Sequence, residues 1–515
     1  MLDGQILKGI WFSMKGHFEF KTAYQFAMPH IGSIQRISAL LRLRMDAGEI
    51  SPGQKLPSTR ALASDLGVSR STVVSVYEQL ASEGYIETAP GSRAQVALNL
   101  AGSTKIRHPA LKTDQGETRK LSASAGRIAA LPLPTQPEIK PGDINFLYGA
   151  IADQDFPKLL WRKLYNQELM KRQAHLYYAE PEGDVELRTQ LQGYLLRARG
   201  MSCSKEQIII VQGAQQAIDL CARLLTDPGS AVLMEEPCYL RARRAFEGIG
   251  AHVTPIPVDE QGLMTDHLPD TKHALVYVTP SHQFPLGSVL TIGRRRELLV
   301  WAARNRCWII EDDYDGEFRY GLRPVQTLQS LDEDDSVIYI GTFSKALSPQ
   351  LRLGYLVLPV GLAAVFRQAK QLSDRHAPSL EQRVIARLIQ SGAYERHIRR
   401  VRRANEGKRA VLIDSIHKFL PANVDIEGTA SGLHIVLWLI DIQMDDEPAL
   451  IARARTLGVG IWGITSLYSA GDMLRRKKCA GLVMGYAGLM SADIMKGVQR
   501  LAQAVQQTRT KATGH

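Results

Sequence analysis

Hydrophobic positions follow two different periods along this chain. Between residues 31 and 97 they recur every three to four residues in three successive segments, which predicts three amphipathic helices. From about residue 143 onward, short apolar runs alternate with helical patterns. Five of these runs are expected to be buried strands: 207–211, 231–234, 274–278, 308–310 and 337–340. Strands that alternate with helices predict a largely parallel sheet covered on both faces.

The first region carries the local signals of a winged helix-turn-helix. Its second helix is predicted to begin after the N-cap residue Ser58 and to end at Gly67, and the third begins after Ser69. Two short helices joined by a tight glycine-containing turn form a helix-turn-helix. Two β-type runs then flank Pro90 and Gly91, which predicts a hairpin that would form the wing.

The start of the third helix offers donors to a nucleic acid. Backbone N–H groups at a helix N-terminus attract phosphate. Ser69, Arg70, Ser71 and Thr72 are compact donors that fit a major groove. In the alternative interpretation, Ser69 only caps the helix and Arg70 is only a surface charge.

Composition divides the chain into four parts. Residues 99–142 are rich in Pro, Ser, Thr, Lys and Arg without a sustained apolar period, which predicts a flexible or partly extended linker. It separates the winged-helix region, residues 31–98, from a large α/β region, residues 143–515. Residues 1–30 combine aromatic residues with interrupting charges, so we expect an N-terminal arm or an upstream start-site artefact rather than a signal peptide.

Charge and cysteine usage narrow the class of protein further. The net charge of +11 permits a polyanionic partner such as double-stranded DNA, although such a charge equally serves solubility. No stretch has transmembrane length, so no membrane partner is expected. The five cysteines are widely spaced and lack a CxxC or a Cys/His cluster, which favours neither disulfides nor a metal site. A cytoplasmic protein is expected.

Residues that could react with or bind a ligand follow the ends of the predicted strands. Lys345 follows the run 337–340, and open α/β folds bind ligands at such carboxyl ends. A partly desolvated lysine has a lowered pKa, and its free amine can form a Schiff base with an aldehyde. Read alone, a lysine at this position is more often a solvated surface charge.

The neighbouring strand ends supply complementary groups. Gly213 opens a helix whose amides could hold a phosphate, although a glycine after a strand is commonly just a turn. The acids in 311–315 are usually a solvated face or a metal site, but one carboxylate there could pair with a protonated pyridine nitrogen. Thr342, Ser344 and Arg352 share the lysine's loop. Phosphate cradle, carboxylate and lysine together predict a site for pyridoxal 5'-phosphate (PLP).

The stretch PGQKLPSTRALASDLGVSRSTVVSVYEQLASEGYIET closely resembles the winged helix of the GntR family of transcription factors. The resemblance implies that Arg60, Arg70 and Thr72 contact DNA phosphates or bases, and that Gly91 lies at the tip of the wing. The family often has Gly-Ser-Gly-Thr-Phe-Val after this turn. Here Arg93 stands in that stretch and could supply an additional phosphate or minor-groove contact.

Residues 143 to 500 resemble fold-type I aminotransferases, most specifically in TFSKALSPQLRLGY and EDDYDGEFRY. Their union with a GntR-type winged helix resembles the MocR subfamily of bacterial regulators. The fold class expected is an N-terminal winged helix-turn-helix, an α/β aminotransferase-like domain and a small C-terminal α+β subdomain. The resemblance also implies a homodimer that binds DNA, PLP and a small-molecule effector, which is PLP itself or an amino compound.

The resemblance further implies a role for each matching residue. Lys345 would form the Schiff base, Asp312 would face the pyridine nitrogen and Tyr314 the phenolate oxygen. Tyr239 would stack on the ring. The remaining expected contacts are phosphate ligands (Gly213, Ala214, Gln215, Thr342, Arg352, and Tyr178 from the partner subunit) and effector contacts (Arg241 and His282).

Two departures from the aminotransferase pattern bear on activity. Phe284 stands where aminotransferases usually have an asparagine, so the ring-oxygen contact is lost or moves to His282 or Gln283. Val483 stands where an arginine clamps the substrate carboxylate, and losing that clamp weakens turnover. We therefore expect a sensor with slight catalysis. A working aminotransferase with an accessory winged helix is the alternative, and a cofactor-free dimerisation scaffold is a third interpretation.

The basic run 395–403 has helical spacing and two interpretations. It is either a charged helix face near the small subdomain, which we favour, or a second surface that faces DNA.

Overall fold

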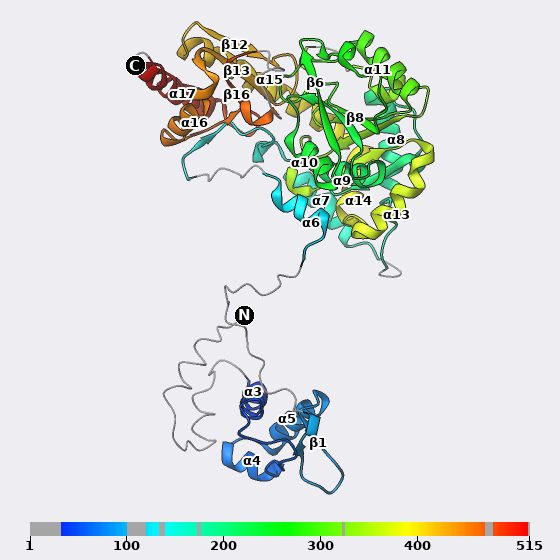
Figure 1. The fold of residues 1–515 in the computed structure, drawn as a ribbon, viewed down its shortest axis with the longest axis vertical. Coiled ribbons are helices and arrows are strands. Elements are labelled where there is room, and N and C mark those ends of the chain that lie inside the picture. The colour runs from blue at the N-terminus through cyan, green and yellow to red at the C-terminus, as the bar shows by residue number, and fades with distance from the viewer. Residues whose placement is uncertain are drawn as a thin grey trace. The chain divides into compact units, whose positions relative to one another are not determined.

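The computed structural model describes residues 32–99, 120–132, 140–172, 177–321, 325–468 and 477–512. The chain divides between residues 119 and 120 into a smaller N-terminal unit and a larger C-terminal unit. Figure 1 shows the smaller unit in blue and the larger one from cyan to red. The expected arm, residues 1–30, and residues 100–119 and 133–139 of the expected linker lie outside the described residues.

The smaller unit contains the predicted helices and wing. Its elements are α3 (Ser33–Asp46), α4 (Thr59–Leu66), α5 (Arg70–Ser82), β1 (Ile86–Glu87) and β2 (Gln95–Val96). The two strands pair antiparallel, and the apolar faces of the three helices share one core with them. Gly67 ends α4 at a φ of 65°, a left-handed conformation that glycine adopts without strain. The helix-turn-helix and the hairpin are confirmed.

The larger unit is built on an eight-stranded mixed sheet in the order β4-β11-β10-β9-β8-β5-β6-β7. The strands from β10 to β6 run parallel, whereas β4, β11 and β7 pair antiparallel. Their bounds are β4 (Ile208–Val211), β5 (Ala231–Glu236), β6 (His252–Asp259), β7 (Gly262–Leu263), β8 (Leu275–Val278), β9 (Trp308–Asp313), β10 (Val337–Thr342) and β11 (Gly354–Val357). The five predicted strands are confirmed, and β6, β7 and β11 were not foreseen.

Helices cover both faces of this sheet. In β5, Val232 and Met234 point into the core under one group of helices, and Leu233 points into the core on the opposite face. The first group comprises α9 (Ala214–Leu225), α10 (Leu240–Ile249) and α13 (Ala363–Asp374), and the second comprises α7 (Lys158–Leu169), α8 (Val185–Arg199), α11 (Ile292–Asn305), α12 (Leu328–Leu331) and α14 (Ser379–Gln390). Burial on both faces explains the continuous apolar runs.

A smaller α+β subdomain follows, as predicted. Its antiparallel sheet has the order β12-β13-β16-β15, and β3 pairs parallel with β14 beside it. One core joins these strands to three helices. The bounds are β3 (Ile144–Asn145), β12 (Val424–Glu427), β13 (His434–Gln443), β14 (Val459–Gly460), β15 (Trp462–Gly463), β16 (Cys479–Gly485), α15 (Ala393–Phe419), α16 (Glu447–Thr456) and α17 (Ser491–Ala512).

Helix α15 connects the two cores of the larger unit. Tyr394 and Ile398 pack in the core of the main sheet, whereas Leu412 and Ile416 pack in that of the subdomain. The basic run 395–403 lies on this helix with its charged residues mostly outward. Neither α15 nor any other helix in the described part of the chain is long and apolar enough to cross a membrane.

One segment of the expected linker is structured. Residues Ala123–Ala130 form helix α6, which packs on α10 (Figure 1). The Arg127 guanidinium donates hydrogen bonds to the carbonyl oxygens of Gly248, at 3.2 Å, and Ile249, at 2.8 Å. The prediction of a flexible or extended chain is therefore wrong for these residues, because side-chain contacts with α10 hold a short helix in place.

Candidate functional site

A cavity of about 200 Å³ lies at the carboxyl ends of the central strands. Residues predicted from sequence line much of it: Ala214, Gln215, Tyr239, Asp312, Tyr314, Thr342, Lys345 and Arg352. Ser344, predicted on the lysine's loop, also lines it. The other lining residues were not predicted as such: Tyr148, Gly149, Tyr277, Thr279, Phe284, Asp315, Pro349, Leu433 and His434. Leu433 and His434 stand at the start of β13, so the subdomain closes one side of the cavity.

Lys345 stands on the loop that follows β10. Its Nζ lies 3.4 Å from the carbonyl oxygen of Gly149, a long contact for a lysine donor. Burial lowers the pKa of Lys345, and the nearby carboxylates of Asp315 and Asp312 oppose that shift. A larger fraction of the amine is consequently neutral, which is the form that attacks an aldehyde.

Asp312 occupies β9 and is only 4% exposed. Its Oδ2 accepts a hydrogen bond of 2.5 Å from the Tyr277 hydroxyl, whereas Oδ1 is buried without a hydrogen-bond partner in the structure as described. Burial raises the pKa of Asp312 to about 7; the Tyr277 hydrogen bond opposes this rise, and Asp313 and Asp315 reinforce it. The unpartnered oxygen provides a place for a protonated ring nitrogen.

The N-terminus of α9 and Arg352 lie together at one side of the cavity. Gly213 is the N-cap residue at a φ of 80°, and the first amides of a helix have no intrahelical acceptor. The Arg352 guanidinium donates to the carbonyl oxygen of Gln212 at 3.0 Å. A Cβ atom at position 213 would lie only 3.2 Å from Arg352 Nη1, so glycine permits this close approach.

Side chains that sequence reasoning missed hold this turn in place. Asp374 accepts hydrogen bonds from the amide groups of Gln212 and Gln216, at 2.7 and 2.8 Å, and from the buried Lys370 at 2.6 Å. Gln216 also accepts from the backbone N–H of Gln212. The geometry of the strand-to-helix turn is thereby fixed before any ligand arrives.

Aromatic rings form one wall of the cavity. The ring centroid of Phe284 lies 4.9 Å from the ring centroid of Tyr148. It lies 5.8 Å from the ring centroid of Tyr239, in an edge-to-face arrangement. Burial raises the pKa of Tyr148, and the positive charge of Arg241 opposes the rise. Arg241 is exposed on the first turn of α10, so its charge acts on this wall although the residue does not line the cavity.

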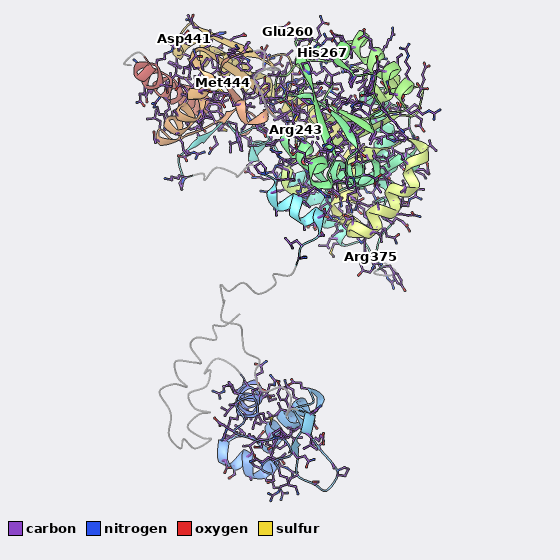
Figure 2. The ribbon with its side chains drawn as sticks, in the orientation of Figure 1. Arg243, Glu260, His267, Arg375, Asp441 and Met444 are labelled. Atoms are coloured by element: carbon purple, nitrogen blue, oxygen red, sulfur yellow. The ribbon has the colours of Figure 1, made fainter. Side chains whose placement is uncertain are left out.

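Other predicted residues lie outside the cavity. Tyr178 is 68% exposed, and its ring lies 3.7 Å below the guanidinium carbon of Arg375, which Figure 2 shows at the edge of the larger unit. Gln283 uses its side chain to join two loops, donating to the carbonyl oxygen of Pro237, directly after β5, and accepting from the N–H of Leu286 in its own loop. Val483 is fully buried in β16.

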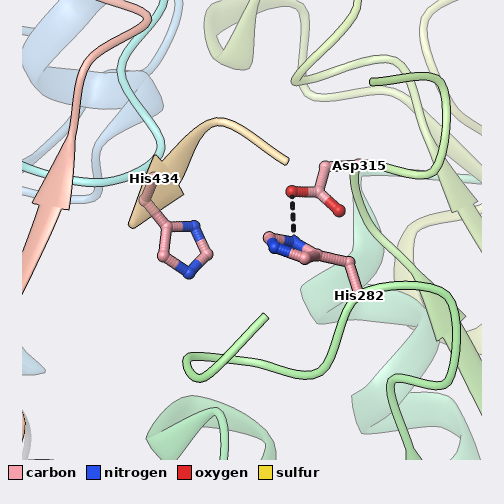
Figure 3. A group of neighbouring side chains, drawn as sticks. All are labelled: His282, Asp315 and His434. Carbon is pink, nitrogen blue, oxygen red and sulfur yellow. Dashed lines mark hydrogen bonds and ion pairs between the residues drawn. The ribbon is translucent and has the colours of Figure 1, made fainter. Parts of the chain in front are cut away.

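His282, expected to contact an effector, is 2% exposed and does not line the cavity. Its ring lies beside Asp315 and His434 (Figure 3) and contacts the hydroxyl of Tyr314. One ligand-type atom from each of His282, Asp315 and His434 lies within 4.8 Å of the others. Burial lowers the pKa of His434 to about 4, so this imidazole is neutral. The sequence predicted no metal site, and this grouping of distant residues was not foreseen.

The smaller unit exposes its predicted donors at the starts of α4 and α5. Arg60, Ser69, Arg70 and Ser71 are exposed and Thr72 is half-buried. The Ser69 hydroxyl accepts from the N–H of Thr72 at 3.1 Å, so the capping role is confirmed. Gly91, in the hairpin turn, has a φ of 76°, which suits glycine.

A winged helix-turn-helix joined to an aminotransferase-like α/β domain defines a class of two-part transcription regulators. Residues 33–96 match the gntR family of bacterial regulatory proteins, and residues 151–445 match aminotransferase class I and II. The chain belongs to the GntR-type regulators that carry this second domain, the MocR type.

The chain is similar over most of its length to several named regulators. It is 35% identical over 472 residues to the HTH-type regulator YdeL of Bacillus subtilis, covering 91% of this chain and 96% of YdeL. It is 32% identical over 465 residues to the probable rhizopine catabolism regulatory protein MocR of Rhizobium meliloti, covering 90% and 92%. It is 32% identical over 402 residues to the pyridoxine biosynthesis regulator PdxR of Corynebacterium glutamicum, covering 78% and 82%.

Solved aminotransferases share the fold of the larger unit. LysN, an alpha-aminoadipate aminotransferase of Thermus thermophilus complexed with N-(5'-phosphopyridoxyl)-L-leucine, superimposes with a TM-score of 0.68 at 27% identity. The match covers 76% of this chain and 98% of LysN. A kynurenine aminotransferase of Pyrococcus horikoshii gives a TM-score of 0.65 at 27% identity, covering 76% and 95%.

Proposed function

We propose that this regulator binds double-stranded DNA through its smaller unit and holds PLP in the cavity of its larger unit, where it senses PLP itself or an amino compound. The observation that carries the proposal is the convergence of Lys345, Asp312 and the N-terminus of α9 on one cavity. Each group stands at a strand end, and each matches a different part of the cofactor.

The residues present fit PLP. The buried Oδ1 of Asp312 lacks a partner in the described structure, and a pyridinium N–H would satisfy it. The α9 amides, Thr342 and Arg352 would hold the phosphate, and the half-buried Tyr239 would stack on the ring. When bound, PLP supplies an aldehyde that reacts with amines and a ring that withdraws electrons from the product.

The protein's own groups set how such a ligand is bound. Lys345 presents an amine whose pKa is lowered by burial, so it can attack without a separate base. Asp312 would orient the ring through its free carboxylate oxygen, because Tyr277 holds the other. Phe284 lines the cavity and offers an apolar edge where a polar contact to the ring would otherwise stand.

Sensing is better supported than turnover. Val483 is a core residue of β16, packed with Val436 and Trp438, and cannot clamp a substrate carboxylate. The Gln283 side chain is already engaged in hydrogen bonds with Pro237 and Leu286. An aminotransferase needs its substrate held in one orientation, and losing a bidentate contact costs much of the rate. We infer that steady-state transamination is slight; rapid turnover of any common amino acid would favour the alternative of a working enzyme.

Binding to DNA follows from the exposed donors of the smaller unit. Arg60 and Arg70 would neutralise phosphates, and Ser71 and Thr72 would face the major groove from the start of α5. Gly91 would bring the wing close to the backbone of the duplex. Arg93, which is exposed in the hairpin, would add a further cationic contact.

A route of coupling from the cavity to α6, the helix that follows the smaller unit in the sequence, runs along α10. Tyr239 caps the start of this helix at the cavity, and Arg241 lies on its first turn. Its end accepts two hydrogen bonds from Arg127 of α6, on the segment that leads back to the smaller unit. A ligand that shifts α10 would therefore change how α6 docks, which is a coupling between two sites through one rigid element.

The proposal also requires a homodimer. Tyr178 is exposed and does not line the cavity of its own chain. It resembles the tyrosine that a partner subunit offers to the phosphate, so a second copy of the chain would give this residue a role. The exposed apolar side chains Leu169 and Met170 lie on the same stretch of chain, as expected of a surface that a second copy covers.

The cofactor assignment is tested by absorbance. Purified protein titrated with PLP should gain a band between about 300 and 500 nm, and borohydride should fix the adduct on Lys345 in peptide mass mapping. Lys345→Ala should abolish the adduct, whereas Lys158→Ala, at an exposed lysine, should retain it. Adducts spread over surface lysines would contradict the assignment.

A further inference from the structure

We propose that His282 and Asp315 are positioning residues that make Tyr314 a hydrogen-bond donor directed into the cavity. The inference rests on the proposed function, because the oxygen that would accept this hydrogen bond is the ring hydroxyl oxygen of PLP. The hydrogen bond from Tyr314 would also compensate for Phe284, which stands where related enzymes present a polar side chain to that oxygen.

Three side chains form a short hydrogen-bonded chain. The Nδ1 atom of His282 lies 2.9 Å from Oδ2 of Asp315 and 2.8 Å from the hydroxyl oxygen of Tyr314. Figure 3 shows His282 between Asp315 and His434, with the hydrogen bond to Asp315 dashed. His282 and Asp315 are each 2% exposed, so water does not compete for these bonds.

The position of the proton on His282 follows from its neighbours. As a carboxylate, Asp315 can only accept, so Nδ1 must carry the proton. Placing it on Nε2 instead would bury an N–H without an acceptor in the described structure and leave Asp315 facing a lone pair. A buried donor without an acceptor is unfavourable, which selects the Nδ1–H form.

That tautomer determines what Tyr314 can do. Its oxygen contacts the same Nδ1–H that Asp315 accepts from, so Tyr314 can only share that N–H as a second acceptor and cannot donate to Nδ1. The Tyr314 hydroxyl has a single proton, which can therefore be donated to an acceptor other than His282. Tyr314 lines the cavity, so its proton is directed to a ligand there. Burial keeps the Tyr314 pKa well above its usual value, so the hydroxyl retains that proton.

Two glycines keep the imidazole in this orientation. A Cβ atom at position 432 would lie 1.9 Å from Cε1 of His282, and one at position 287 would lie 3.0 Å from Nε2. Gly432 and Gly287 also have φ values of 83° and 78°, which disfavour other residues. The ring is thus enclosed by backbone and cannot turn to present Nε2 to Tyr314.

The test compares PLP with an analogue that lacks the ring hydroxyl. His282→Phe should weaken PLP binding about tenfold in absorbance titrations, the loss of roughly one hydrogen bond. The same variant should change the affinity for the deoxy analogue less than about twofold. His273→Phe, at a buried histidine outside the cavity lining, is the matched control and should leave both affinities unchanged.

A second measurement distinguishes the loss of this hydrogen bond from a general effect on folding. Tyr314→Phe should weaken PLP binding at least as much as His282→Phe, and the double variant should be no weaker than Tyr314→Phe alone. Equal losses for PLP and the deoxy analogue would mean a structural role only and would overturn the proposal. Wild-type protein that fails to bind PLP at all would instead refute the proposed function.

Metal binding at the same group is a further outcome that the experiment separates. Dialysis of the wild-type protein against EDTA should leave PLP affinity unchanged. A loss that Zn²⁺ restores would show that His282, Asp315 and His434 hold an ion, and would contradict the hydrogen-bonded arrangement.

Discussion

At the scale of single residues, motif spacing located the reactive groups but not their surroundings. Lys345 and Asp312 could be predicted because they follow apolar runs on adjacent parallel strands, whose carboxyl ends meet at one edge. His434 and Tyr148 could not be predicted, since a tyrosine or histidine beside an apolar run reads as core. Only the closure of the subdomain over the sheet brings them to the cavity.

The buried Asp312 predicts a pH dependence of stability. Its pKa is about 7 when folded and about 3.9 when unfolded, so between these values the folded state binds the extra proton. Its contribution to stability therefore falls as pH rises from about 4 to about 7. In cofactor-free protein, Asp312→Asn should gain in melting temperature relative to wild type between pH 5 and pH 7.5, equivalent to up to about 3 kcal/mol.

Differential scanning fluorimetry at a series of pH values would measure the difference in melting temperature between Asp312→Asn and wild type. Asp334→Asn, at an exposed aspartate, serves as the control and should track the wild type throughout. A gap for Asp312→Asn that stays constant with pH would show that the carboxylate is already ionised in the folded protein.

At the scale of elements, long periodic patterns were reliable and short ones were not. The three helices of the smaller unit were predicted from their caps and apolar faces. Helix α6 was missed because an isolated helix of eight residues is unstable in water. Its stability comes from Arg127 and α10, which the local sequence does not reveal. Strand β11 was missed although 353–358 is a continuous apolar run, typical of a buried strand.

Removing the Arg127 side chain should release α6 from α10. In hydrogen exchange followed by mass spectrometry, Arg127→Ala should speed exchange of residues 123–130 at least about tenfold, because α6 loses two hydrogen bonds to charged donors. Lys120→Ala, an exposed charge just before the helix, should have no such effect. Unchanged exchange in the Arg127 variant would remove α6 from the proposed route.

The start of α5 should carry phosphate contacts. Arg70→Ala should weaken DNA binding about tenfold and lower the slope of log affinity against log salt by about 1. Arg44→Ala removes the same charge from α3, where the residue pairs with Glu49, and should leave the slope nearly unchanged. Equal slopes for the Arg70 variant and wild type would place the DNA contact elsewhere.

At the scale of the whole molecule, the fold class of each unit could be predicted from sequence patterns, whereas the homodimer and the contact of Tyr178 with a partner's site rest on the family resemblance alone. Tyr178 is 68% exposed and stacks on Arg375 rather than entering its own cavity. A contact supplied across a dimer depends on two copies of the chain, so neither sequence pattern nor the fold of one chain contains it. Mixed dimers give direct access to this question.

Co-purified heterodimers of Lys345→Ala and Tyr178→Ala should regain PLP binding at one site per dimer. In such a dimer, the protomer that keeps Lys345 receives an intact Tyr178 from its partner. Absorbance titration of differently tagged, co-purified chains would count the sites. Binding no better than in the Tyr178→Ala homodimer would mean that Tyr178 acts within its own chain or has no role.

The central claim is that occupancy of the Lys345 cavity alters DNA binding. The most direct measurement is the fluorescence anisotropy of a labelled duplex, selected from a random pool by the wild-type protein, titrated with and without PLP. Allosteric coupling typically amounts to 5- to 150-fold in affinity. We predict a change of at least about fivefold for wild type and none for Lys345→Ala. An affinity indifferent to PLP in wild type, or an equal change in both proteins, would contradict the account.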